Sequence, residues 1–145
     1  MARIVVGIDG SEHSNQALRW ALGEARLRAA SLRIVLAWKV PTYFVEGFAP
    51  VEAIPDPTAL TEAARERLDS IVYELTGGST EVPIEKIVVE GAAAEILVEE
   101  SEGADLLVVG SRGHGGFAGL LLGSVSQQCA HHAACPVVII RAKAA

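Results

Sequence analysis

Short runs of apolar, mostly β-branched residues recur along this chain and constrain its fold more than any other feature. The first run, Ile4 to Ile8, is interrupted only by Gly7. Such runs are typical of strands that are covered on both faces, since a half-exposed strand would alternate apolar and polar residues. The segments predicted as strands are Ile4 to Ile8, Leu32 to Trp38, Ile84 to Val89, Asp105 to Val109 and Val137 to Arg141.

The segments between these runs carry apolar residues at helical spacing. Ser11 or Ser14 is the expected N-cap of the first helix, and Asp56 followed by Pro57 favours the start of the second. The alternation of strands and helices predicts an α/β fold, a single-domain, doubly wound, five-stranded parallel sheet with helices on both faces. The last two helices are predicted over roughly Ala93 to Glu102 and from Ser124 to about Ala134.

This fold type favours the strand order 3-2-1-4-5. Ligands of such sheets bind beyond the carboxyl ends of the strands, at the point where the strand order reverses. In the favoured order that point lies between the first and fourth strands. We therefore expect Asp9 and Gly110, which follow these strands, to face each other across one crevice.

The loop after the fourth predicted strand is rich in glycine and suited to holding an anion, because its backbone N–H groups are accessible. Ser124 followed three residues later by Gln127 indicates a capping box. A helix is therefore expected to begin there, with the positive end of its dipole facing the loop. Strand, loop and helix start together predict a phosphate site.

Three better-known motifs do not account for this loop. Residues 113–118 fit the letters of the dinucleotide fingerprint, but they follow the fourth strand, and no acidic residue lies downstream to bind a ribose hydroxyl. A Walker loop requires a lysine before Ser124, and the loop contains no lysine. The chain also contains no G-x-S-x-G nucleophile elbow.

The spacing Gly110-x2-Gly113-x9-Gly123-Ser124 resembles the nucleotide-binding motif of the universal stress protein family, in its ATP-binding branch. Other stretches match in the corresponding places: V-V-G-I-D-G-S at the first strand, A-D-L-L-V-V-G-S-R-G before the loop, L-L-L-G-S-V-S after it and C-P-V-V-I-I-R at the end. The resemblance covers residues 1–145 as one domain. It implies an adenine nucleotide alpha hydrolase-like fold.

The same resemblance implies where a nucleotide would bind. Asp9 and the backbone near Ala37 would hold the adenosine end, with Gly110 beside the ribose. The implied ligand is ATP, with or without Mg²⁺. The residues implied to surround the phosphates are Gly113, Gly123, Ser124 and Val125.

Three polar residues near the predicted site have two interpretations each. Asp9 either contacts the ligand or braces the turn at Gly10. Arg112 either pairs with a phosphate or is a solvated loop residue. His114 either touches phosphate or is an exposed loop histidine.

Charge and composition argue against several classes of protein. The formal net charge is −6, which disfavours nucleic-acid binding. All acidic residues lie at or before Asp105, so the glycine loop and its helix hold no carboxylate that would repel phosphate. Two cysteines do not make a disulfide framework, and neither a signal peptide nor a membrane span of ~18 apolar residues is evident. We expect a cytoplasmic protein without nucleic-acid or membrane partners.

Cysteine, histidine and aromatic residues offer weaker hypotheses. A metal site at Cys129, His132 and Cys135 would draw three ligands from one helix stripe, an unusual arrangement, so we expect core packing there instead. The aromatic residues are expected to be core or loop anchors rather than base-stacking platforms. They are Trp20, Trp38, Phe44 and Phe48, of which the last two lie in the long segment Lys39 to Pro55 and could help cover a ligand.

The last predicted strand bears on assembly. Val137 to Ile140 would be an exposed edge strand of β-branched residues, which is an aggregation hazard unless it is covered. The family resemblance implies dimers formed through the same strand. We therefore expect a homodimer through Val137 to Arg141.

These observations favour a nucleotide-dependent stress-response switch or sensor rather than an enzyme. The glycine loop has neither a lysine nor a carboxylate, so in a slow Mg²⁺-dependent ATPase only Asp9 could hold the metal or activate water. Such an ATPase remains one alternative. A sensor of AMP or cyclic AMP is another, and a structural dimer that has lost nucleotide binding is a third.

Overall fold

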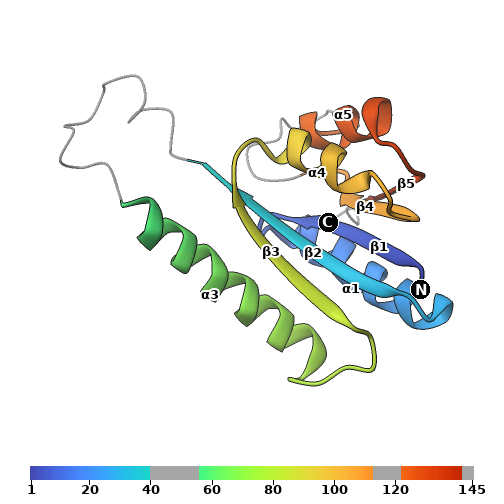
Figure 1. The fold of residues 1–145 in the computed structure, drawn as a ribbon, viewed down its shortest axis with the longest axis horizontal. Coiled ribbons are helices and arrows are strands. Elements are labelled where there is room, and N and C mark those ends of the chain that lie inside the picture. The colour runs from blue at the N-terminus through green and yellow to red at the C-terminus, as the bar shows by residue number, and fades with distance from the viewer. Residues whose placement is uncertain (40–55, 113–121, 142–145) are drawn as a thin grey trace.

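The computed structural model describes residues 1–39, 56–112 and 122–141, which form one five-stranded sheet with helices on both sides (Figure 1). The strand order is β3-β2-β1-β4-β5, and every neighbouring pair is parallel. This confirms the expected fold class and strand order. The elements are β1 (Arg3–Ile8), α1 (Glu12–Arg28), β2 (Ser31–Trp38), α3 (Pro57–Thr76), β3 (Ile84–Glu90), α4 (Ala93–Ser101), β4 (Leu106–Gly110), α5 (Ser124–His132) and β5 (Val137–Ile140).

The sheet separates two apolar layers. One face packs against α1 and α3, and the other against α4 and α5 (Figure 1). Neighbouring strand residues point to opposite faces, so Val6 joins the α1 layer while Val5 joins the α4 layer. Because both faces are covered, the central strands are apolar at most positions, which explains the apolar runs of the sequence.

Two of the expected helix starts are confirmed. Ser11, rather than Ser14, is the N-cap of α1, and its hydroxyl accepts a hydrogen bond from the Ser14 N–H at 3.3 Å. Asp56 caps α3 by accepting from the Thr58 N–H at 3.1 Å, with Pro57 at the first helical position. Each cap contributes about 1 kcal/mol to stability. The predicted bounds of the other elements differ from the observed ones by one or two residues.

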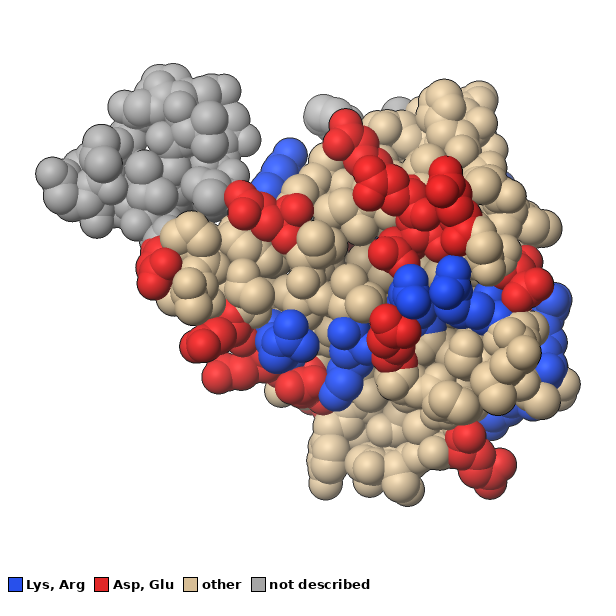
Figure 2. Space-filling model, in the orientation of Figure 1, with Lys and Arg blue, Asp and Glu red and all other residues tan. Residues whose placement is uncertain are grey.

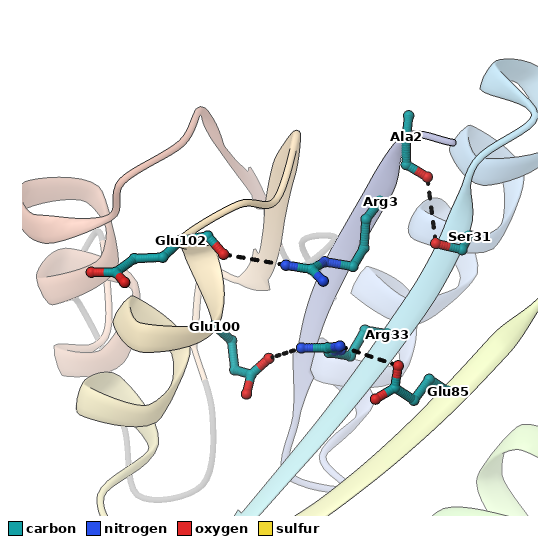
Figure 3. A network of polar contacts seen from close by, with 7 residues as sticks. All are labelled: Ala2, Arg3, Ser31, Arg33, Glu85, Glu100 and Glu102. Atoms are coloured by element: carbon teal, nitrogen blue, oxygen red, sulfur yellow. Dashed lines mark hydrogen bonds and ion pairs between the residues drawn. The ribbon is translucent and has the colours of Figure 1, made fainter.

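An ion-pair network ties α4 to the amino-terminal half of the sheet (Figure 3). Arg33 on β2 donates to Glu100 of α4 at 2.6 Å and to Glu85 of β3 at 3.2 Å. The hydrogen bond to Glu100 is the main cause that raises the pKa of Arg33. Arg3 donates to the Glu102 carbonyl at 3.2 Å. Figure 2 shows the acidic side chains over α4 beside basic side chains of the sheet, so charge is paired across this face.

Two side-chain expectations can be compared with the structure. Trp20 was expected in the core or as a loop anchor, but 37% of its surface is exposed on α1, so a core position is wrong. Of the three residues expected to pack in the core, Cys129 is fully buried in the α4 layer, where burial raises the pKa of its thiol to about 11. Cys135 is half-buried and His132 is exposed, so the expectation is wrong for His132. Within the described ranges, no helix has both the length and the apolar character needed to cross a membrane.

Candidate functional site

The carboxyl ends of β1 and β4 lie side by side. Val6 of β1 pairs with Val108 of β4, so both strands end at the same edge of the sheet, next to Asp9 and Gly110. The helix that follows β1 lies on one face of the sheet, and the helix that follows the β4 loop lies on the other. This is the arrangement in which open α/β sheets form a ligand crevice.

Asp9 is held by the turn that follows β1. Its Oδ1 accepts the Ser11 N–H at 2.8 Å, and its own N–H donates to Ser14 Oγ at 3.1 Å. The turn-bracing interpretation of Asp9 is therefore observed. These bonds fix the carboxylate at the edge of the sheet, beside β2, where the pairing of Ile8 with Leu36 leads on to Ala37.

The close packing of α1 against Gly110 leaves little room for a side chain at this position. A Cβ on Gly110 would lie 3.0 Å from the carbonyl oxygen and 3.1 Å from the carbonyl carbon of His13, in the first turn of α1. Real Cβ atoms rarely come this close to backbone. The absence of a side chain at Gly110 therefore lets the first turn of α1 pack close to the end of β4.

Hydrogen bonds to the Ser111 carbonyl oxygen join the two ends of the glycine loop. Ser111 O accepts the Gly123 N–H at 2.7 Å and the Ser126 hydroxyl at 3.1 Å. The Ser111 N–H donates to the Ile140 carbonyl of β5 at 2.8 Å. Ser111 and Ser126 are buried, with 4% and 1% of their surfaces exposed. These hydrogen bonds of Ser111 hold the start of α5 at the carboxyl edge of the sheet.

The start of α5 corrects the predicted capping box. Its N-cap is Gly123 and not Ser124, and no side chain caps the helix. Ser124 is the first helical residue, and the Gln127 N–H donates to the Gly123 carbonyl at 3.0 Å. The physical reason is that Ser111 captures the Gly123 N–H and fixes the helix start one residue earlier. The N–H groups of Ser124 and Val125 belong to the first turn, where no intrahelical acceptor exists.

The other predicted site residues are placed unequally. Ala37 lies next to the last residue of β2, at the same edge as Asp9. Arg112 follows Ser111 directly and is half-buried. The expectations for Gly113, His114, Phe44 and Phe48 concern residues outside the described ranges.

Several buried polar atoms at this edge have no partner. Among the described residues, they include Nδ1 of His13, Oδ1 of Asn15 and Nε1 of Trp38. His13 and Asn15 lie at the start of α1, and Trp38 is the last residue of β2. Buried polar groups are normally hydrogen-bonded, so orphaned atoms near the crevice need an explanation, such as a ligand.

Arg67 of α3 is a residue of this edge that the sequence does not indicate. Gly10 has a positive φ of 84°, and the Arg67 guanidinium occupies the space where a Gly10 Cβ would lie. Gly10 and Arg67 are far apart in the sequence and come together only because α3 packs beside β2. No local spacing pattern could have revealed this contact.

Groups of three or more metal-ligating side chains are absent from the residues that the structure describes. Cys129 and Cys135 are both free thiols. Burial is the main cause that raises the pKa of each thiol. Among the described residues, the charged side chains at this edge include the Asp9 carboxylate and the guanidinium groups of Arg67 and Arg112.

The chain is similar in sequence to proteins of one family. A model described as "Universal stress protein family" matches residues 1–141. Universal stress protein Rv2005c of Mycobacterium tuberculosis is 37% identical over 144 residues, which cover 97% of this chain and 45% of that protein. This chain thus spans about half the length of the curated relatives that it matches.

Two solved structures share the fold. The structure of "hypothetical protein MJ0577" superimposes with a TM-score of 0.78 at 26% identity, covering 99% of this chain and 98% of that one. A universal stress protein in complex with cAMP superimposes with a TM-score of 0.59 at 34% identity, covering 96% of this chain and 95% of that one. That second protein binds an adenine nucleotide.

Proposed function

Because this chain belongs to the universal stress protein family, we propose that it is a nucleotide-dependent switch that binds ATP across the ends of β1 and β4. The observation that carries this proposal is the hydrogen bond from the Gly123 N–H to the Ser111 carbonyl at 2.7 Å. It presents the start of α5, with its positive dipole end, at the carboxyl edge beside β1. Helix starts of this kind bind phosphate groups.

We propose one orientation for the bound nucleotide. The phosphates lie against Gly113, Gly123, Ser124 and Val125, with Arg112 as a pairing cation, because no residue after Asp105 carries a carboxylate. The nucleoside end lies towards β1 and β2. There Asp9 and the backbone at Ala37 contact the adenosine, and Gly110 lies beside the ribose.

A second candidate is binding of AMP or cyclic AMP. The solved complex with cAMP, at 34% identity, favours it for this chain because the two chains superimpose over nearly their full lengths. Calorimetric titration with ATP, AMP and cyclic AMP under identical conditions ranks the three ligands. An affinity for cyclic AMP above that for ATP would reject ATP as the preferred ligand.

Binding rather than turnover is the proposed activity. The glycine loop contains no lysine and no carboxylate to hold Mg²⁺ or activate water. We expect ATP to remain intact in the complex when Mg²⁺ is added. Release of phosphate that depends on Mg²⁺ and is lost in Gly123→Val would assign slow ATP hydrolysis instead.

We also propose that the chain forms a homodimer through Val137 to Arg141. β5 lies at the edge of the sheet, and all four of its residues are only half-buried in the isolated chain. A second copy would cover this apolar edge, which would otherwise invite aggregation. Light scattering should give the mass of a dimer at micromolar concentration, and a monomer there contradicts the proposal.

A further inference from the structure

The contact between Arg67 and Gly10 places a cation at the crevice. The Nη2, Cζ and Nε atoms of Arg67 all fill the space that a Cβ on Gly10 would need. Gly10 directly follows Asp9 and adopts a left-handed conformation, with φ of 84°. Only glycine both adopts this conformation easily and leaves room for the guanidinium group. The backbone at the end of β1 therefore forms a seat for Arg67.

Arg67 is an unpaired cation among the residues that the structure describes. It has no hydrogen-bond or ion-pair partner within the described ranges, and its residue is exposed. Several other cations of the sheet and helices are paired, among them Arg33 with Glu100 and Lys86 with Asp69. A guanidinium that lies on the backbone at a strand end, and pairs with no other described residue, can contact a ligand.

The direction from which Arg67 enters decides which part of a nucleotide it meets. α3 packs against β2 and β3, whereas the start of α5 is attached to the end of β4 through Ser111. Arg67 therefore reaches the end of β1 from the side away from the phosphate-binding helix start. Because the phosphates are proposed to lie at the start of α5, the base of the nucleotide would lie on this other side.

A second observation points to a ligand on the same side. Trp38 ends β2 two residues after Leu36, and its buried Nε1 donor has no acceptor among the described residues. Leu36 packs in the same apolar layer as Leu68, the neighbour of Arg67. The ring nitrogens of a base are hydrogen-bond acceptors and would suit this orphaned donor.

We propose that Arg67 is a base-binding residue whose planar guanidinium, seated on Gly10, stacks on the purine ring of the bound nucleotide. This inference rests on the proposed nucleotide function and adds to it a residue of α3. Arginine is suited to the role because its plane stacks on aromatic faces and its charge is attracted to the ring. Lysine has the charge but no plane.

The test compares adenosine, AMP and ATP as ligands of the wild-type chain and three variants. Arg67→Ala removes the plane and the charge, and Arg67→Lys keeps the charge alone. Arg65→Ala is the matched control, because Arg65 is exposed on the same helix, while the atoms nearest to a Gly10 Cβ all belong to Arg67. Circular dichroism and thermal unfolding verify that each variant folds as the wild type does.

If Arg67 stacks on the base, Arg67→Ala should lower the affinity for all three ligands by the same factor, about 3- to 30-fold. Arg67→Lys should recover only part of this loss, and Arg65→Ala should bind as the wild type does. A loss that appears with ATP but is absent with adenosine would overturn the assignment, because Arg67 would then contact phosphate. Unchanged affinity in Arg67→Ala would overturn it too.

The same experiment separates this inference from the function on which it rests. If the wild type binds nucleotide and Arg67→Ala binds equally well, only the role of Arg67 is rejected. If the wild type binds none of the three ligands, both the nucleotide function and the role of Arg67 are rejected.

Discussion

Replacing Ser124 and Ser126 separately by alanine tests how the start of α5 is held. If Ser124 were the N-cap, as the S-x-x-Q pattern suggests, Ser124→Ala would reduce the free energy of unfolding by about 0.5–2 kcal/mol. In the structure the N-cap is Gly123, and Ser124 is exposed at the first helical position. Ser124→Ala should therefore change stability by less than about 0.5 kcal/mol.

Ser126→Ala should lower the free energy of unfolding more than Ser124→Ala does, although no sequence motif marks Ser126. The Ser126 hydroxyl is buried and donates to Ser111 O at 3.1 Å, with Gly123 O also within 3.0 Å. Both carbonyls keep another donor, from the Gly123 and Gln127 N–H groups, so no buried acceptor is left unpaired. The expected loss is therefore that of one ordinary hydrogen bond, about 0.5–1.5 kcal/mol.

The assay is urea unfolding followed by circular dichroism without nucleotide, because bound ligand would add to the apparent stability. The two variants should differ in the midpoint of unfolding at an unchanged denaturant slope. A free energy of unfolding lower by 1 kcal/mol or more in Ser124→Ala, together with no change in Ser126→Ala, would refute the hydrogen bonding of Gly123 and Ser126 to Ser111.

Three further predictions concern packing and charge elsewhere in the fold. Gly110→Ala should destabilise the protein by about 1–3 kcal/mol in denaturant unfolding, because its Cβ would lie 3.0 Å from the His13 carbonyl oxygen; full wild-type stability would show that α1 does not approach β4 so closely. Glu100→Gln removes the main partner of the half-buried Arg33 and should cost about 1–2 kcal/mol in thermal unfolding, less at 1 M salt, whereas equal loss at both salt concentrations would mean that charge is not the cause. Burial raises the pKa of the Cys129 thiol from 9.0 to about 11, so the free energy of unfolding should be highest below pH 9 and fall by about 2–3 kcal/mol as pH rises through 11. Cys129→Ala should not show this fall, and an equal fall in the variant would contradict the prediction.

Local patterns were sufficient to predict most of the fold. The central strands are buried on both faces, so they appear in the sequence as apolar runs, and the caps at Ser11 and Asp56 follow from side chains close to the helix starts they satisfy. The strand order required knowledge of the fold type. Trp20 was misplaced because helical spacing alone does not reveal how much of each face of α1 the sheet covers.

The site was predicted less completely, because its geometry depends on contacts between distant residues. The Ser124 pattern suggested a cap, but the Ser111 carbonyl, on the other side of the loop, decides where α5 begins. Ser126 and Arg67 have no sequence signal of their own. Their importance appears only when Ser111 and Gly10 are brought beside them in space.

The central claim, that the start of α5 binds the phosphates of a nucleotide, is tested most directly by the affinity of Gly123→Val for ATP. The backbone of Gly123 has φ of −77° and ψ of 171°, which valine also adopts, so the variant should fold. Its side chain would obstruct the N–H groups that we propose bind the phosphates. Calorimetry should detect ATP binding by the wild type and none by the variant. Equal affinity in both proteins would contradict the account.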